Sequence, residues 1–127
     1  LYGSSGEVRP FSQYDDGGDL VETAFLVQGL LTMRQYLDPA IPDEQGMIDR
    51  INLLVDGVEW DWYTQGQNVL YWHWSPNVGF QLNHQIRGWN ETLITYVLAA
   101  SSETHGITPE IYHQGYASNG GKMNGQN

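Results

Sequence analysis

Four carboxylates lie close together near the start of the chain, at Asp15, Asp16, Asp19 and Glu22. Carboxylates this close repel one another, so the pKa of at least one of them should rise. A carboxyl group with a raised pKa can act as a general acid near neutral pH. The structural alternative is equally open, since Asp19 and Glu22 have the spacing of a helix capping box. We expect Asp15 and Asp16 to lie in the loop before that helix, because two glycines follow them.

A fifth carboxylate, Glu91, lies at the expected start of another apolar helix. Alone, a glutamate in a first helical turn is more often explained by the helix dipole than by catalysis. The parallel with Asp19 and Glu22 strengthens the functional interpretation, because two apolar helices would each begin with carboxylates. If both N-termini open onto one end of a bundle, acids face each other across a cavity. A pair of carboxyl groups on opposite sides of a cavity is the minimum that glycoside cleavage requires.

Aromatic residues are frequent, at 13% of the chain, and many lie between residues 60 and 89. Trp and Tyr rings stack on sugar rings and also dominate core packing, so about half of them should be core. Neutral amides lie among these rings, which suits an uncharged, polyhydroxylated ligand. We take as candidate substrate contacts Trp60, Trp62, Tyr71, Trp72, Trp74, Arg87, Trp89 and Asn90.

The net charge of −10, with five Lys and Arg in total, argues against binding to nucleic acid or to an anionic membrane. The chain has no cysteine, and its four histidines show no ligand spacing on one helix face, so we expect no metal and no cofactor. No stretch has the roughly 18 apolar residues of a membrane span.

The 127 residues suit one domain, and the pattern of apolar positions predicts an all-α fold. The expected helices cover residues 19–36, 43–60, 90–101 and 109–115. Residues 69–74 are expected to pair with 80–83 as a short β-hairpin or ordered loop. The Gly- and Asn-rich end, 117–127, is expected to be a loop or disordered tail.

Two of these helices, 19–36 and 90–101, are apolar nearly all round, so each needs neighbours on every side. A chain of this length cannot easily supply them. We therefore expect both ends to be cut from a longer protein. Leu1 to Gly6 also lacks the basic region and apolar core of a signal peptide.

The sequence resembles the glucoamylase-like proteins of glycoside hydrolase family 144. The resemblance extends to about Tyr116, and its strings are long and of unusual composition. They are YDDGGDLVETAFL (14–26), VEWDWY (58–63), NVLYWHWSPN (68–77), GWNETLITYVLAASS (88–102) and YHQG (112–115).

The resemblance implies that the chain is a fragment of an (α/α)6 barrel that hydrolyses β-1,2-glucan with inversion at the anomeric carbon. It implies Glu91 as the general acid, with the base or water-holding group among Asp15, Asp19 and Glu22. Inversion needs carboxyl groups about 6.5–9.5 Å apart, and Arg87 is expected to orient one of them. A full barrel needs roughly three times this length, so the isolated chain is expected to be inactive.

Two other expectations and three alternatives accompany this interpretation. The partner is a β-glucan oligosaccharide or polysaccharide, and the full-length protein is periplasmic or secreted. Related domains perform transglycosylation, so that reaction is an alternative to hydrolysis. A non-catalytic glucan-binding domain is a second alternative, and a structural fragment that needs its missing helices to fold is a third.

Overall fold

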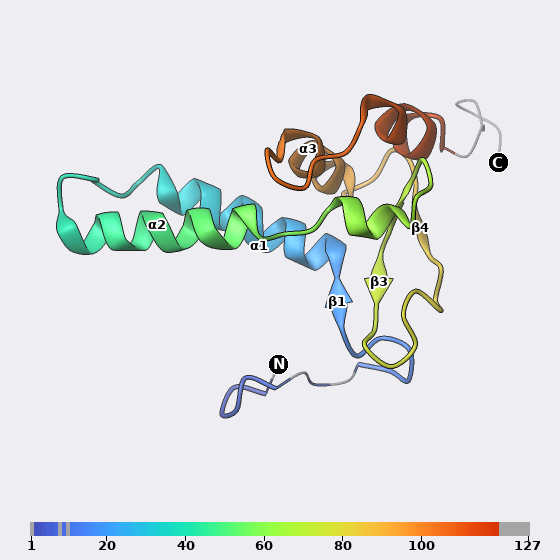
Figure 1. The fold of residues 1–127 in the computed structure, drawn as a ribbon, viewed down its shortest axis with the longest axis horizontal. Coiled ribbons are helices and arrows are strands. Elements are labelled where there is room, and N and C mark those ends of the chain that lie inside the picture. The colour runs from blue at the N-terminus through green and yellow to red at the C-terminus, as the bar shows by residue number, and fades with distance from the viewer. Residues whose placement is uncertain (1, 8, 10, 120–127) are drawn as a thin grey trace.

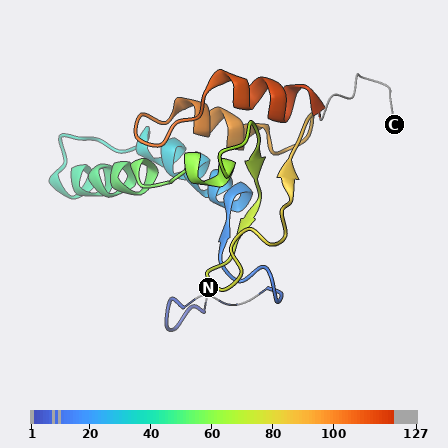
Figure 2. The same ribbon diagram turned by 45° about the vertical axis from the view of Figure 1, so that its right-hand side comes forward.

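The structure, a computed structural model, describes residues 2–7, 9 and 11–119. Its main elements are helices: α1 (Leu20–Arg34) and α2 (Pro42–Asp56) lie side by side, and α3 (Leu93–Ser101) packs against α1 (Figure 1). A π-helix, η2 (Ile111–Ala117), packs against α3. Small strand pairs lie beside this helical layer (Figure 2). The predicted helical class is therefore confirmed, with short strands added.

The first helix agrees closely with the prediction of 19–36. The Asp19 side chain accepts hydrogen bonds from the backbone N–H groups of Val21 and Glu22, which fixes the start of α1. The second half of a capping box, a bond from Glu22 back to the Asp19 N–H, is absent from the described bonds. One face of α1 is buried, whereas Leu26 on another face is 62% exposed.

The second helix is shorter than the predicted 43–60. It begins at Pro42, which suits the first helical position, and it ends at Asp56 with Gly57 as its C-cap. Glycine disfavours continuation of a helix, and Trp60 instead leads into a short 3-10 helix, η1 (Asp61–Thr64). Ile51 is buried and Leu54 is exposed, as expected for a peripheral helix.

The predicted β-hairpin between 69–74 and 80–83 is wrong in its pairing. Strand β2 (Leu70–Tyr71) pairs antiparallel with β4 (Gln85–Ile86). Strand β3 (His73–Trp74) pairs antiparallel with β1 (Gly18–Asp19). Residues 80–83 form a turn, because Asn83 has a φ of 48° and interrupts the extended backbone. The segment 70–74 therefore joins the N-terminal loop to the β4 strand.

The third helix begins at Leu93, and the predicted start at residue 90 is wrong. Trp89 has a φ of 60°, and the Asn90 side chain accepts hydrogen bonds from the backbone and hydroxyl of Thr92. Both features hold residues 89–92 in a turn. Glu91 therefore precedes α3 and does not lie in its first turn.

The last predicted helix, 109–115, starts at Pro109 as expected and continues through η2. Of the predicted tail 117–127, residues 120–127 lie outside the described part of the chain. No helix within the described ranges is long and apolar enough to cross a membrane.

The core is formed where α1, α3, η2 and the strands meet. Tyr96 of α3 lies at its centre: its hydroxyl accepts a hydrogen bond from the Leu70 N–H at 2.9 Å and donates one to the Ile86 carbonyl at 2.8 Å. One buried side chain thereby ties α3 to both β2 and β4. The main members of this core are Leu20, Val21, Ala24, Val27, Trp60, Leu70, Ile86, Tyr96, Ala99 and Tyr116.

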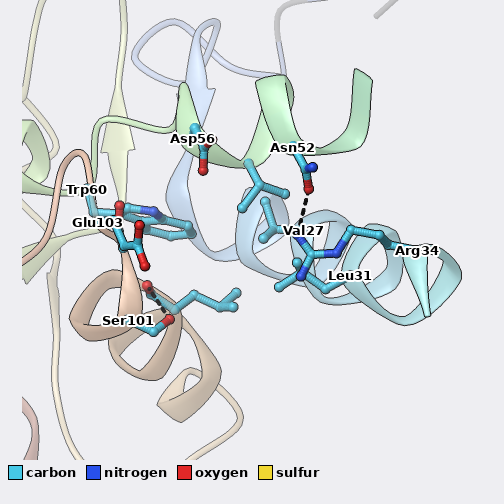
Figure 3. Close-up of a pocket in the computed structure, with 11 residues that line it drawn as sticks. Val27, Leu31, Arg34, Asn52, Asp56, Trp60, Ser101 and Glu103 are labelled. Atoms are coloured by element: carbon cyan, nitrogen blue, oxygen red, sulfur yellow. Dashed lines mark hydrogen bonds between the residues drawn. The ribbon is translucent and has the colours of Figure 1, made fainter. Parts of the chain in front are cut away.

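A cavity of about 420 Å³ lies between α1, α2 and the end of α3 (Figure 3). At its edge Arg34, the last residue of α1, donates a hydrogen bond to Asn52 at 2.6 Å. Ser101, the last residue of α3, also lines it. The cavity thus reaches the C-terminal ends of α1 and α3, whereas the candidate carboxylates lie before these helices or, for Glu22, in the first turn of α1.

Candidate functional site

The site begins at Asp19, where β1 turns into α1. Its Oδ1 accepts three hydrogen bonds, from the backbone N–H groups of Val21 and Glu22, both at 3.0 Å, and from the Trp72 indole N–H at 2.9 Å. The Leu20 N–H also donates to the Trp72 carbonyl at 2.9 Å. These bonds hold the Asp19 carboxylate in one orientation and leave its second oxygen for other partners.

That second oxygen faces His73, a residue that sequence reasoning did not select. His73 Nε2 lies 3.7 Å from Asp19 Oδ2 and 3.9 Å from Asp15 Oδ2, and all three side chains are mostly buried. The antiparallel register places Asp19 opposite His73. The pairing comes from contact between distant strands, so no spacing along the chain or around a helix could have indicated it.

Aromatic rings enclose this histidine. The Trp72 ring stacks on His73 with centroids 5.7 Å apart and planes 11° apart, and His84 lies 5.2 Å from the Trp72 ring. His73 Nδ1 is buried and has no hydrogen-bond partner among the described residues. Trp72, predicted to bind substrate, therefore supports the Asp19–His73 pair by both stacking and hydrogen bonding.

Gly17 and Gly18 allow the close approach of the segments that form the site. A Cβ atom on Gly18 would lie 2.2 Å from the Tyr63 hydroxyl oxygen, and one on Gly17 would lie 2.3 Å from the Trp74 carbonyl oxygen. Both distances are shorter than any normal contact, so a side chain at either position would push β1 away from its neighbours. The glycine pair is therefore a packing requirement of the site.

The other predicted acids are placed differently. The Asp16 N–H donates to Ser75 Oγ at 3.3 Å, and its Oδ1 is buried with no hydrogen-bond partner in the described ranges. Glu22 is exposed on α1. Asp15 and Asp16 lie in the loop before β1, as predicted. The structure thus groups Asp15 and Asp19 around one histidine and leaves Glu22 exposed.

Tyr63 belongs to the surroundings of Asp19. Its pKa is raised to about 12, first by burial and then by the negative charges of Asp19 and Glu59. The phenol therefore stays protonated in the folded protein at pH values where the unfolded chain ionises.

This shift predicts a loss of stability at alkaline pH. Above about pH 10 the unfolded state loses the Tyr63 proton while the folded state keeps it up to about pH 12. The folded state then binds more protons, so the free energy of unfolding falls as pH rises through this range. Urea unfolding at pH 9 and pH 11 measures the fall, and it should be smaller in Tyr63→Phe. Equal falls in both proteins would contradict the assignment.

Glu91 lies in an exposed turn that is held firmly on either side. The Tyr116 hydroxyl accepts from the Asn90 N–H at 3.0 Å and donates to the Asn90 carbonyl at 2.9 Å. Trp89 has a positive φ, which is rare for a bulky residue and marks backbone fixed by its surroundings. Trp89 is 65% exposed and Glu91 is also exposed. The turn therefore presents an aromatic ring and a carboxylate together.

Of the remaining residues predicted to contact substrate, some are core side chains and others lie nearer the surface. Trp60 is 1% exposed and Tyr71 is also buried, so in this structure they are core side chains and offer no free face to a sugar. Trp74 is half-buried in β3. Arg87 donates to Gln85 Oε1 and to the carbonyls of Gln114 and Gly115, none of which is a carboxylate. The expected carboxylate partner of Arg87 is thus absent from its described bonds.

The two acidic regions are connected through one strand segment. The first residue of α1 bonds to Trp72, and Tyr96 in the first half of α3 bonds to Leu70. Both helices therefore begin beside residues 70–72. This arrangement agrees with the expectation that their N-termini open onto one end of the fold. The distance between Glu91 and the Asp15–Asp19 pair stays a prediction.

Comparison with known proteins shows which proteins the chain resembles. Residues 83–127 match a family model described as "Putative glucoamylase". The chain is 49% identical over 119 residues to an exo β-1,2-glucooligosaccharide sophorohydrolase (non-reducing end) of Parabacteroides distasonis. This match covers 91% of the chain and 16% of the relative.

Two solved structures of β-1,2-glucanases are also similar to this chain. An endo-β-1,2-glucanase from Chitinophaga pinensis, in complex with sophorotriose and glucose, is 54% identical with a TM-score of 0.91, over 94% of this chain and 29% of that one. A β-1,2-glucanase from Parabacteroides distasonis is 48% identical with a TM-score of 0.88, over 91% of this chain and 17% of that one. The predicted resemblance to glucoamylase-like β-1,2-glucanases is therefore confirmed, for a chain that spans less than a third of these relatives.

Proposed function

We propose that the full-length protein containing this chain is a glycoside hydrolase that acts on β-1,2-glucan. The observation that carries the proposal is the likeness to bacterial β-1,2-glucan hydrolases, near 50% identity over more than nine-tenths of the chain. The geometry supports it, because carboxylates lie beside aromatic rings in both acidic regions. Neutral sugars need both groups, one for the reaction and one for stacking.

The proposed fold of the full-length protein is an (α/α)6 barrel, of which this chain supplies one part. The exposed apolar residues support this, since Phe25 and Leu26 of α1 and Val97 of α3 would be covered by neighbouring helices. The relatives have the additional length for such helices. We infer that the isolated chain lacks activity, because the remaining helices would complete the substrate cleft.

In the proposed mechanism Glu91 donates its proton to the glycosidic oxygen that leaves. A carboxylate from the group Asp15, Asp19 and Glu22 removes a proton from a water molecule, whose oxygen attacks the anomeric carbon from the opposite face. The bond to the leaving oxygen breaks as the new bond forms, so the configuration inverts. Among the candidate bases, the placement of Asp15 and Asp19 beside His73 favours these two over the exposed Glu22.

The test is hydrolysis of linear β-1,2-glucan by the full-length protein, followed by proton NMR of the first products. Inversion of a β-linkage should give the α-anomer before mutarotation. Glucans with β-1,3, β-1,4 and α-1,4 linkages serve as controls and should be cleaved slowly or not at all. A β-anomer as first product would contradict inversion, and products longer than the substrate would identify a transglycosylase. Binding without reducing ends would identify a glucan-binding domain.

A further inference from the structure

A second cavity lies beside η1 and outside the carboxylate groups described above. It has a volume of about 510 Å³, within the range of ligand-binding pockets. Its wall includes Glu59, Asp61, Trp62, Gln65, Phe80 and His105. These residues come from η1 and from the loops around it. Of these residues, only Trp62 is among the substrate contacts that were predicted from the sequence.

The floor of this cavity is an aromatic platform. Trp62 is 56% exposed, and its ring lies 6.3 Å from the Phe80 ring at 43°. Phe80 is itself held edge-on by Tyr63 at 5.6 Å. Such a Trp face is costly to leave in water, and its fixed position lowers the entropy lost when a ligand stacks on it.

The backbone around Trp62 is also fixed. Thr64 donates to the Asp61 carbonyl at 2.7 Å and accepts from the Gly66 N–H at 3.1 Å, which closes the short η1 turn. Gln65 follows with a φ of 51° and donates to Asn83 at 3.4 Å. The cavity is therefore formed by an ordered turn whose amide groups lie at its rim.

The polar groups at the rim select the chemistry of the ligand. Asp61 lies 3.2 Å from His105, and Glu59 adds a second carboxylate, while no Lys or Arg among the described residues lines the cavity. An anionic ligand would be repelled. An uncharged sugar fits, because its hydroxyl groups can donate to carboxylate and amide oxygens while its ring face covers Trp62.

The cavity is adjacent to the Asp19 region without being part of it. Trp62 and Tyr63 are consecutive in η1: Trp62 lines the cavity, whereas the Tyr63 hydroxyl approaches Gly18 beside Asp19. Phe80 lines the cavity and packs on Tyr63, whose hydroxyl points to the segment before Asp19. A glucose unit on Trp62 would lie in a cavity whose lining includes neither Asp15 nor Asp19.

We propose that the Trp62–Phe80 cavity is a distal glucan subsite, which binds a glucose unit of the β-1,2-glucan chain remote from the bond being cleaved. This inference rests on the proposed function for the identity of the sugar. The cavity anchors long chains and contributes little to the shortest substrates. Its loss should weaken binding without changing the chemical step, which is the signature of uniform binding energy.

The test compares Trp62→Ala with Trp62→Phe and Tyr36→Ala in the full-length protein. Tyr36 is 94% exposed and lies outside the cavity, so it controls for the loss of a surface aromatic ring. Trp62→Ala should raise KM for long β-1,2-glucan about tenfold, or about 1.4 kcal/mol, with kcat nearly unchanged. The KM for the shortest cleaved oligosaccharide should change little. Trp62→Phe should recover most of the loss.

The outcomes separate the two proposals. If wild-type protein cleaves the glucan and Trp62→Ala matches Tyr36→Ala, the subsite is overturned and the proposed function stands. A fall in kcat for substrates of every length overturns the distal placement. If wild-type protein does not cleave the glucan, the proposed function is overturned, and affinity electrophoresis in β-1,2-glucan decides the subsite. Retardation lost only in Trp62→Ala supports it, and equal mobility of all variants overturns it.

Discussion

Glu91→Gln in the full-length protein should lower the rate of β-1,2-glucan hydrolysis by about 10²–10⁴-fold, the range for loss of a general acid. The amide keeps the size and polarity of the side chain but cannot supply the proton that the leaving glycosidic oxygen needs. Because Glu91 is exposed in a turn held by Asn90 and Tyr116, the substitution should leave the fold intact. Reducing ends released from linear β-1,2-glucan measure the rate.

Two comparisons make this prediction specific. Glu110→Gln is the matched control, since Glu110 is also an exposed glutamate near the start of a helical segment. It should retain wild-type hydrolysis. A substrate with an activated leaving group, such as an aryl β-glycoside, needs less protonation and should be cleaved by Glu91→Gln with a smaller loss. Near wild-type hydrolysis of β-1,2-glucan by Glu91→Gln would reject Glu91 as the acid.

The parts of the fold that are encoded locally could be predicted from the sequence. Asp19 as the cap of α1 and Pro109 at the start of the last helical segment are signals within one turn of chain, and the structure has both. The start of α3 could not be predicted in this way. The Asn90 side chain and the Tyr116 hydroxyl hold residues 89–92 out of the helix, and Tyr116 is distant in sequence.

The candidate site shows the same division between local and long-range information. Carboxylate and tryptophan residues were recognisable by type, and the structure places two of them, Asp19 and Trp72, in direct contact. His73 was missed because only the β1–β3 pairing brings it between two carboxylates. Trp60 was selected by type, yet it is buried in a core cluster that it shares with residues of α1 and α3. Residue type thus identified the chemistry, and tertiary contacts decided which residues are available for it.

His73 also changes how the acidic cluster is understood. A histidine between Asp15 and Asp19 can hold both carboxylates at a fixed separation, and the stacked Trp72 ring restricts its motion. In the same region Asp19 uses one oxygen for the α1 cap and the Trp72 indole. One oxygen of the Asp19 carboxylate therefore stabilises the fold, and the other faces His73. A substitution that keeps the first oxygen and removes the negative charge can distinguish these two roles.

Asp19→Asn provides that separation and should lower β-1,2-glucan hydrolysis at least about 100-fold, as expected for loss of an acid–base group or its charge. Asparagine keeps a side-chain oxygen that can accept from Val21, Glu22 and Trp72, and it caps helices as well as aspartate does. The free energy of unfolding should therefore change by less than about 1 kcal/mol. Asp19→Ala should lose activity and in addition about 0.5–2 kcal/mol, because the cap is removed.

The comparison with Asp43→Asn controls for the loss of one negative charge, since Asp43 is exposed in the first turn of α2. It should retain both activity and stability. The Tyr63 pKa provides an independent readout, because Asp19 is one cause of its rise and removal of that charge should lower it. Full activity in Asp19→Asn would exclude a role for the Asp19 charge in hydrolysis and leave Asp15 as the better-placed base. A large loss of stability in Asp19→Asn would show instead that the charge itself holds β1, His73 and α1 together.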